Sequence, residues 1–199
     1  MDLKDLRSNR SLALMLTLFI LTASSCSLTT DLVADKLDPR TSVTITYNQS
    51  PMILYRDVSG RAAHARDYVY LGPIEVNRSG SYRHYLWLGI WSTMDDVQPG
   101  RSRDGFESIV FFADGEPLPL DVAGWTPDAI GASEPVYLKP VASAADAYYE
   151  VTIDQLRLIA EAKDVRLQST GSSSVYYEPW NEQSSAKAGL IEFLHTSFD

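Results

Sequence analysis

The side chains best suited to metal binding or nucleophilic chemistry are few in this sequence: three histidines and one cysteine. His64, His84 and His195 are spread along the chain, and no two of them stand at the spacing of a zinc motif such as His-Glu-x-x-His. His195 falls near the end of an expected helix, where a histidine interacts favourably with the helix dipole. Each histidine is therefore interpreted as structural, and no metal or other cofactor is expected.

Motifs for other kinds of chemistry are equally incomplete. The Gly-x-Ser-x-Gly motif of hydrolases does not occur, although a Ser-His-Asp triad is set by geometry and not by sequence order. Asp95 and Asp96 form an acidic pair without the further oxygen ligands of a calcium loop. Segment 100–105 has two glycines and two arginines, but it lacks the Lys-Ser/Thr of a phosphate-binding loop. Both are interpreted as solvated loops, and no catalytic residue is assigned.

Aromatic side chains form the one pattern with a functional character. Tyr68 and Tyr70 share one face of an expected strand, and Tyr85, Trp87 and Trp91 share one face of another. If these strands pair, the five rings make one surface, which binds proteins or stacks on sugars when it is exposed. The alternative is that this face packs in the core, since Tyr and Trp are largely buried on average. From its place in mid-strand, Trp87 is expected to be buried, whereas Trp91, close to polar residues, is expected to be partly accessible.

The N-terminal segment has the three-part pattern of a secretory signal. Residues 1–10 carry three basic side chains, residues 11–22 are almost unbroken apolar, and Ala23-Ser24-Ser25 supplies small residues before Cys26. The apolar run is shorter than the roughly 20 residues that span a bilayer. This pattern predicts export of the chain and removal of residues 1–25.

Ala23-Ser24-Ser25-Cys26 resembles the lipobox of bacterial lipoproteins, although that family prefers leucine where this chain has Ala23. The resemblance implies cleavage before Cys26 and acylation of its sulfur and its new amino group. Several acyl chains are needed for stable anchoring, because one alone binds only marginally. Ser27 follows, and not the Asp that marks inner-membrane retention in many proteobacteria, so the resemblance implies the outer membrane, facing the periplasm. The alternative is an ordinary signal peptide, with Cys26 left as a free thiol.

Charge and composition limit the kinds of partner that the chain is expected to bind. The formal net charge is −9, and removal of residues 1–25, which carry one net positive charge, leaves −10. Such an acidic domain repels phosphate backbones and anionic membrane surfaces, so nucleic acid is not expected as a partner. With 45% apolar and 22% charged residues, the composition is that of a globular protein.

The mature chain is expected to be a lipidated N-terminus and polar tether over residues 26–42, followed by a single domain over residues 43–199. Alternation and β-branched residues predict strands at 43–47, 52–56, 68–71, 74–76, 83–93, 106–113, 116–120, 148–151, 165–167 and 175–177. Segment 83–93 is apolar on both faces, which predicts a strand covered on both sides. Asp114-Gly115 predicts a tight hairpin, and the prolines at 117 and 119 predict that the returning strand lies at an edge or is short.

Two helices are expected in the C-terminal third. Thr152 and Gln155 have the spacing of a capping box, which predicts a helix ending near Lys163. A second helix is expected from about Ser184, with one apolar face formed by Ala186, Leu190, Phe193, Leu194 and Phe198. Many short strands followed by two helices predict an α+β domain, mainly an antiparallel β-sandwich or curled sheet with the helices packed on it.

These observations favour a membrane-anchored envelope lipoprotein that acts as a non-catalytic binding or scaffolding module, with an envelope protein as its partner. One alternative is an envelope enzyme that acts on peptidoglycan, lipid or polysaccharide. Another is a subunit of a secretion or assembly machine. Small sandwich lipoproteins of the type VI secretion apparatus are similar in size, anchoring and expected fold, which is a similarity of general plan.

Lipidation predicts that mass spectrometry of the mature protein shows an acylated N-terminal Cys26. Because this lipid is the predicted anchor, Cys26→Ala should release the domain into the soluble fraction or stall processing. A mature protein that begins at Ser24, or that carries Cys26 as a free thiol, would contradict the prediction.

Overall fold

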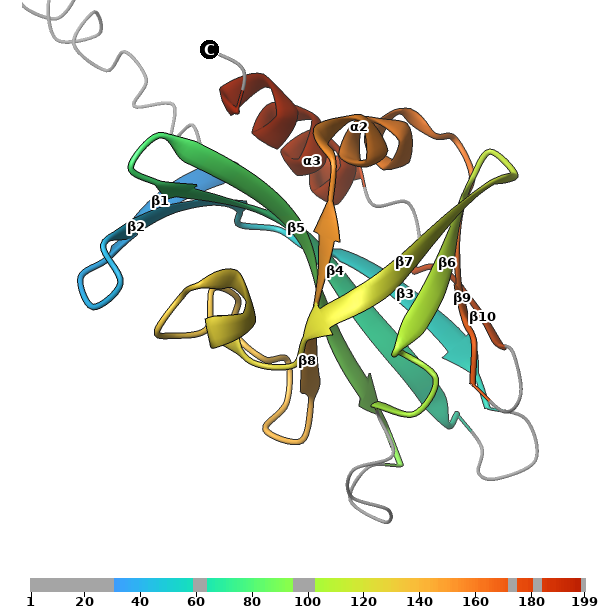
Figure 1. Cartoon of the computed structure of the whole chain (residues 1–199). Coiled ribbons are helices and arrows are strands. Elements are labelled where there is room, and N and C mark those ends of the chain that lie inside the picture. Colours follow the sequence, from blue (N-terminus) through green and yellow to red (C-terminus); the bar gives the residue numbers. More distant parts are fainter. Residues whose placement is uncertain (1–30, 59–63, 95–102, 172–174, 181–183, 198–199) are drawn as a thin grey trace, which may run out of the picture. The chain divides into compact units, whose positions relative to one another are not determined.

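The computed structural model describes residues 31–58, 64–94, 103–171, 175–180 and 184–197. Within them lie ten strands, two α-helices and a short 3-10 helix (Figure 1). The strands are β1 (Val33–Asp38), β2 (Val43–Asn48), β3 (Met52–Asp57), β4 (Arg66–Arg78), β5 (Ser81–Ser92), β6 (Ser108–Ala113), β7 (Glu116–Gly124), β8 (Ala145–Val151), β9 (Val165–Ser169) and β10 (Val175–Pro179). The helices are η2 (Pro127–Ile130), α2 (Ile153–Glu161) and α3 (Ser184–Thr196).

Strand β4 organises the sheet. It pairs with β5 along almost its whole length, from Asp67↔Ser92 to Arg78↔Ser81. On its other side it pairs first with β3, over residues 66–71, and then with β2, over residues 74–77. From β5 the sheet continues through β8, β7, β6, β9 and β10, and β10 returns to β3. Eight antiparallel strands thus close into a barrel, and β1 and β2 project from it as an arm.

The expected β-sandwich or curled sheet is therefore wrong, because the sheet closes on itself. Closure depends on β10, which pairs with β3 through Glu178↔Tyr55 and Pro179↔Leu54. The alternation of inward and outward residues is the same in a barrel and in a sandwich, so local pattern does not distinguish them. The fold therefore does not support the expected similarity to the small sandwich lipoproteins of the type VI secretion apparatus.

Apolar side chains fill the barrel interior. Leu54, Leu88, Phe111, Tyr149 and Leu167 are all inaccessible to solvent. An eight-stranded barrel is just wide enough for its side chains to fill. Helices α2 and α3 cover one end of the barrel (Figure 1), and their apolar faces join the same core.

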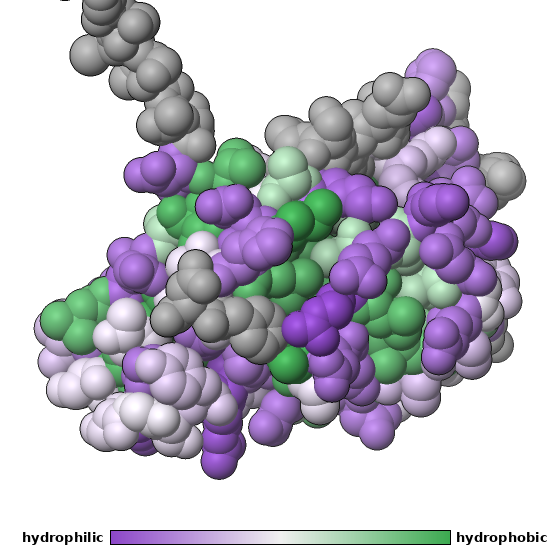
Figure 2. All heavy atoms as spheres, turned by 90° about the horizontal axis from the view of Figure 1, so that it is seen from above, coloured by the Kyte–Doolittle hydropathy of each residue, from purple (hydrophilic) through white to green (hydrophobic). Residues whose placement is uncertain are grey.

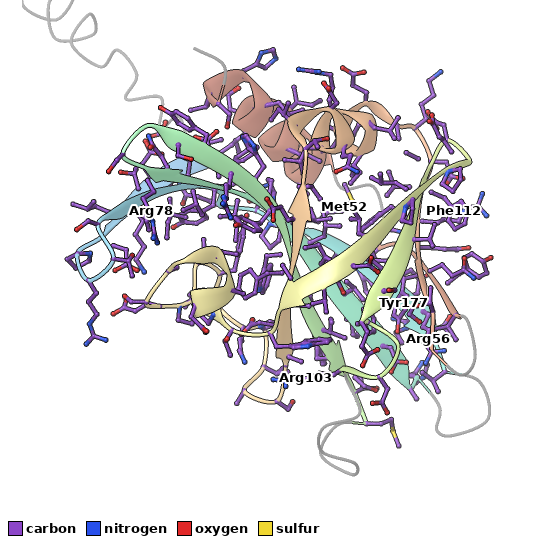
Figure 3. All side chains as sticks on the ribbon, viewed as in Figure 1. Met52, Arg56, Arg78, Arg103, Phe112 and Tyr177 are labelled. Atoms are coloured by element: carbon purple, nitrogen blue, oxygen red, sulfur yellow. The ribbon has the colours of Figure 1, made fainter. Side chains whose placement is uncertain are left out.

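The opposite end of the barrel holds an ion pair. Arg56 Nε lies 2.7 Å from Asp67 Oδ2, and the Arg56 guanidinium lies 5.6 Å from the centre of the Tyr177 ring (Figure 3). Burial raises the pKa of Tyr177 to about 12, while the nearby positive charge of Arg56 acts in the opposite direction. Arg56 and Asp67 thus neutralise each other's charge at the boundary between the apolar interior and the solvent.

A second core lies outside the barrel, between the outer faces of β2, β4, β5 and β8 and the segment that contains η2. Its buried members are Val43, Ile45, Ile74, Val76, Tyr85, Trp87, Ile130, Ala132, Val136, Tyr137 and Tyr148. The η2 segment is tied to the arm through Asp38, which accepts hydrogen bonds from the backbone N–H of Ser133 and, at 2.8 Å, from its hydroxyl. The hydrogen bond from the Ser133 N–H is the main cause that holds the pKa of Asp38 well below its ordinary value.

Two glycines make this second core compact. The Tyr137 ring lies 2.3 Å from where a Cβ of Gly72 would stand, and the Trp87 ring lies 2.6 Å from the corresponding position at Gly89. The Trp87 ring is thus the close neighbour of Gly89. The two strands expected at 68–71 and 74–76 form one continuous strand, β4, because Gly72 leaves room for the Tyr137 ring without interrupting the pairing.

Two further expectations differ from the structure. Residues 33–38 were assigned to the tether, but they form β1, which pairs with β2 along its whole length, and the compact unit begins at Asp31. Strand β7 has nine residues and lies between β6 and β8, so it is neither short nor at an edge. Its prolines are tolerated because β8 pairs with β7 only at Val122 and Gly124, beyond Pro117 and Pro119. The expected tight hairpin is confirmed, with positive φ at residues 114 and 115.

Both expected helices are confirmed. Thr152 Oγ1 accepts a hydrogen bond from the Gln155 N–H at 3.2 Å, and Gln155 Oε1 accepts one from the Thr152 N–H at 2.8 Å, which is the predicted capping box. Lys187 of α3 donates to the carbonyl of Ala162, at the end of α2, and joins the helices. On α3, Phe198 of the expected apolar face lies outside the described residues. Neither α2 nor α3 has the length and apolar character needed to cross a bilayer.

The capping box predicts a measurable loss on substitution. Thr152→Ala should lower the free energy of unfolding by about 1 kcal/mol, because the N-terminal amides of α2 lose their acceptor. For a domain of this size the midpoint of thermal unfolding should fall by roughly 2–4 °C. Thr152→Ser keeps the hydroxyl and should stay close to the parent, so an equal loss in both variants would contradict the capping role.

Candidate functional site

Four aromatic side chains meet on the outer wall of the barrel, near the end that the helices leave uncovered. Strand register places Tyr55 opposite Tyr68 and Tyr68 opposite Trp91, so three rings stand side by side across β3, β4 and β5. Trp180 follows β10, and its backbone N–H donates a hydrogen bond to the carbonyl of Ile53 at 2.9 Å. We call Tyr55, Tyr68, Trp91 and Trp180 the aromatic row, and all four are partly exposed.

The rings of the aromatic row pack against one another. Tyr68 and Trp91 are stacked, with ring centres 4.6 Å apart and an angle of 15° between the planes. On the other side of β4, Trp180 lies 5.4 Å from Tyr68 and meets Tyr55 at 5.0 Å with its plane nearly perpendicular. Each ring of the aromatic row thus contacts at least one other ring of the row.

Arg66 adds a fixed positive charge to the aromatic row. Its guanidinium lies 4.8 Å from the Trp180 ring centre and 5.4 Å from that of Tyr55, within the range of cation–π attraction. Its Nε donates to Asp57 Oδ1 at 2.8 Å. Hydrogen bonds to Asp57 and then to Tyr68 raise the pKa of Arg66 above its ordinary value, so the side chain remains a cation.

The structure separates the five aromatic residues singled out in the sequence. All five lie on the outer face, but Tyr85 is only 3% exposed and Trp87 only 1%, both within the second core. Tyr70 is half-buried beside them, and burial raises its pKa. Only Tyr68 and Trp91 belong to the aromatic row. The expectations that Trp87 is buried and that Trp91 is partly accessible are both confirmed.

Trp87 and Trp91 also differ in how their polar atoms are satisfied. The indole N–H of Trp87 donates to Asp146 Oδ1 at 3.0 Å, and the other carboxylate oxygen of Asp146 lies 3.1 Å from Lys139 Nζ. The Trp87 ring also stacks on Tyr137. The indole N–H of Trp91 is buried and has no hydrogen-bond acceptor in the described part of the chain. Trp87 is thus fully engaged in packing and hydrogen bonding, whereas Trp91 is not.

Three members of the site were not identified from the sequence. Tyr55 lies in a short run whose outer face could not be told from its inner one, and Trp180 follows a strand at a position without periodicity. Arg66 precedes the expected strand and has no motif around it. A row of aromatic residues at one level of the barrel becomes visible only when the register of β3, β4 and β5 is known.

The histidines do not form a second site in the described part of the chain. His84 Nε2 lies 3.0 Å from Glu75 Oε2, a local cross-strand pair, while His64 and His195 are exposed. No group of three or more His, Cys, Asp or Glu side chains in the described ranges is placed to hold a metal. Asp95, Asp96 and residues 100–102 lie outside those ranges.

Comparison with protein-family models, with curated protein sequences and with solved structures found no match for this chain. The site is therefore interpreted from its own geometry.

The contrast between the two tryptophans is testable on the mature chain produced without its signal. Trp87→Ala should lower the free energy of unfolding by about 3–5 kcal/mol, the usual cost of emptying a large core site. Trp91→Ala should cost much less, because the side chain is partly solvated. Denaturant unfolding measures both, and a polar quencher should reach Trp91 more readily than Trp87 in single-tryptophan variants. Equal protection of the two rings would contradict the assignment.

Proposed function

We propose that this protein is a lipid-anchored lipoprotein of the bacterial envelope, and that its barrel is a non-catalytic module that binds a protein partner through the aromatic row. The observation that carries the binding role is the row itself: two tryptophans, two tyrosines and an arginine gathered on one exposed wall. Trp, Tyr and Arg are the residue types most enriched among binding hot spots.

Support for the anchor comes from the sequence. The signal-like segment ends in Ala23-Ser24-Ser25-Cys26, and the compact unit begins at Asp31, only a few residues later. Lipid on Cys26 would therefore hold the folded domain close to the membrane on which it acts, and outer-membrane attachment facing the periplasm is the arrangement that Ser27 favours.

An outer binding surface fits the packing better than an internal one. Interior positions such as Leu54, Phe111 and Tyr149 are filled by side chains that have no access to solvent. Helices α2 and α3 cover one end of the barrel, and the Arg56–Asp67 pair lies at the other. A ligand inside would have to displace this core, whereas the aromatic row is accessible as it stands.

The geometry of the rings favours a protein over a sugar. Sugars bind by stacking on a free aromatic face, but Tyr68 has Trp91 stacked on it from one side and Trp180 beside it on the other. The charged Arg66–Asp57 pair remains accessible beside the rings, and such a pair suits contact with protein side chains and backbone.

The proposal predicts position-dependent cross-linking in cells. A photoreactive amino acid in place of Trp180 should give a discrete adduct with an envelope protein, because the residue lies in the proposed contact. The same group in place of Tyr82, which is 57% exposed near the opposite end of β5, should give none.

A second variant tests the row directly. Trp91→Ala should abolish the Trp180 adduct, whereas Tyr82→Ala should leave it intact, provided that both variants reach wild-type abundance in the envelope. The same adducts at both positions, or an adduct that is insensitive to Trp91→Ala, would refute the binding role of the aromatic row.

A further inference from the structure

The chain enters the folded domain beside α3. The carbonyl of Leu32 accepts a hydrogen bond from the Gln49 N–H at 2.7 Å, and the Gln49 side chain donates to the carbonyl of Asp31 at 2.9 Å. Next to Gln49, Asn48 approaches Gly189 of α3 so closely that a Cβ there would stand 3.2 Å from its side-chain nitrogen. The entry point therefore belongs to the end of the barrel that the helices cover.

The aromatic row lies at the other end of the same wall. Tyr47, next to the entry, pairs with Ile74 of β4, whereas the row pairs with β4 at Tyr68. Six residues of strand separate these two positions, which is roughly 20 Å at about 3.3 Å per residue. Along β3, Met52 likewise lies nearer the helices and Arg56 nearer the opposite end (Figure 3).

The covalent distance to the proposed anchor is short. Cys26 and Asp31 are five residues apart in the sequence. Even a fully extended chain spans at most about 18 Å over five residues. The entry point is therefore held near the membrane. The aromatic row lies roughly a further 20 Å from the entry point, so the short covalent connection does not hold the row near the membrane.

The charges around the aromatic row are unsuited to a lipid surface. The Asp57 side chain is 65% exposed, and Glu178, beside Tyr55 in the sheet, is exposed as well. The charge of Arg66 is already paired with Asp57. Membrane-binding aromatic patches carry unpaired basic residues that meet anionic headgroups, and this wall presents carboxylates instead.

We infer that the anchored domain keeps its helix-covered end next to the membrane and presents the aromatic row toward the aqueous space, where a protein partner meets it. This inference rests on the proposed lipid anchor and names the side from which the partner approaches. Seen from the helix-covered end, the part of the surface that Figure 2 colours shows hydrophobic residues in patches separated by hydrophilic ones.

The test uses the single cysteine of the chain. Lipid on Cys26 leaves no other thiol, so a cysteine introduced elsewhere is a unique site for a fluorophore. Gln49→Cys labels the entry point and Glu178→Cys labels the level of the aromatic row, and both side chains are exposed. The lipidated, full-length mature variants are placed in phosphatidylcholine vesicles that contain lipids with a nitroxide on the headgroup, and only protein that floats with the vesicles is measured.

Quenching should be several-fold stronger at position 49 than at position 178. Equal quenching at the two positions would overturn the orientation, and stronger quenching at position 178 would show that the row meets the membrane. Cys26→Ala protein should not float. If the unsubstituted protein also fails to float, the anchor itself is refuted and the orientation falls with it, so the two failures are distinguishable.

Discussion

The register between β4 and β5 is the constraint on which the rest of the structure depends. It runs over twelve consecutive residue pairs, the longest pairing among the described strands, and leaves the other side of β4 to be shared by β3 and β2. Because β3 takes one half and β2 the other, the sheet divides there into a barrel and an arm. A shift of one residue would exchange the inner and outer faces and place Trp87 and Trp91 inside the barrel.

The division of β4 explains why one outer wall has two environments. Where β2 continues the wall, the η2 segment packs into the angle between the arm and the barrel (Figure 1) and buries Tyr85 and Trp87. Asp38 holds that segment through Ser133, and Gly72 lets the Tyr137 ring come close to the strand. Beyond the reach of this cover, the same face stays partly solvated, and its aromatic side chains pack on one another instead.

Burial and polar satisfaction separate packing from binding within a single strand. Trp87 has its N–H bonded to a buried carboxylate and its ring stacked, as expected for a residue that specifies one packing arrangement. Trp91, four residues further on, is partly exposed, and its indole N–H has no acceptor among the described residues. The aromatic row thus combines rigidity from stacking with accessibility, which lowers the entropy lost when a partner binds.

The local features of the fold can be predicted from the amino-acid sequence. Most strands, the Asp114-Gly115 hairpin and the capping box at Thr152 are among them, because they depend on side-chain period, turn chemistry and a spacing of three residues. The sequence also indicates that β5 is covered on both faces, which holds for its middle, residues 85–90. The remaining features depend on contacts between distant parts of the chain. Closure of the barrel requires β10 to pair with β3, and the aromatic row requires Tyr55 and Trp180 to lie beside Tyr68. Both sets of contacts join residues that are distant in the sequence. An outward-facing aromatic residue has the same local pattern whether a segment from elsewhere in the chain covers it or not, and only the path of that segment decided which rings are core and which are surface.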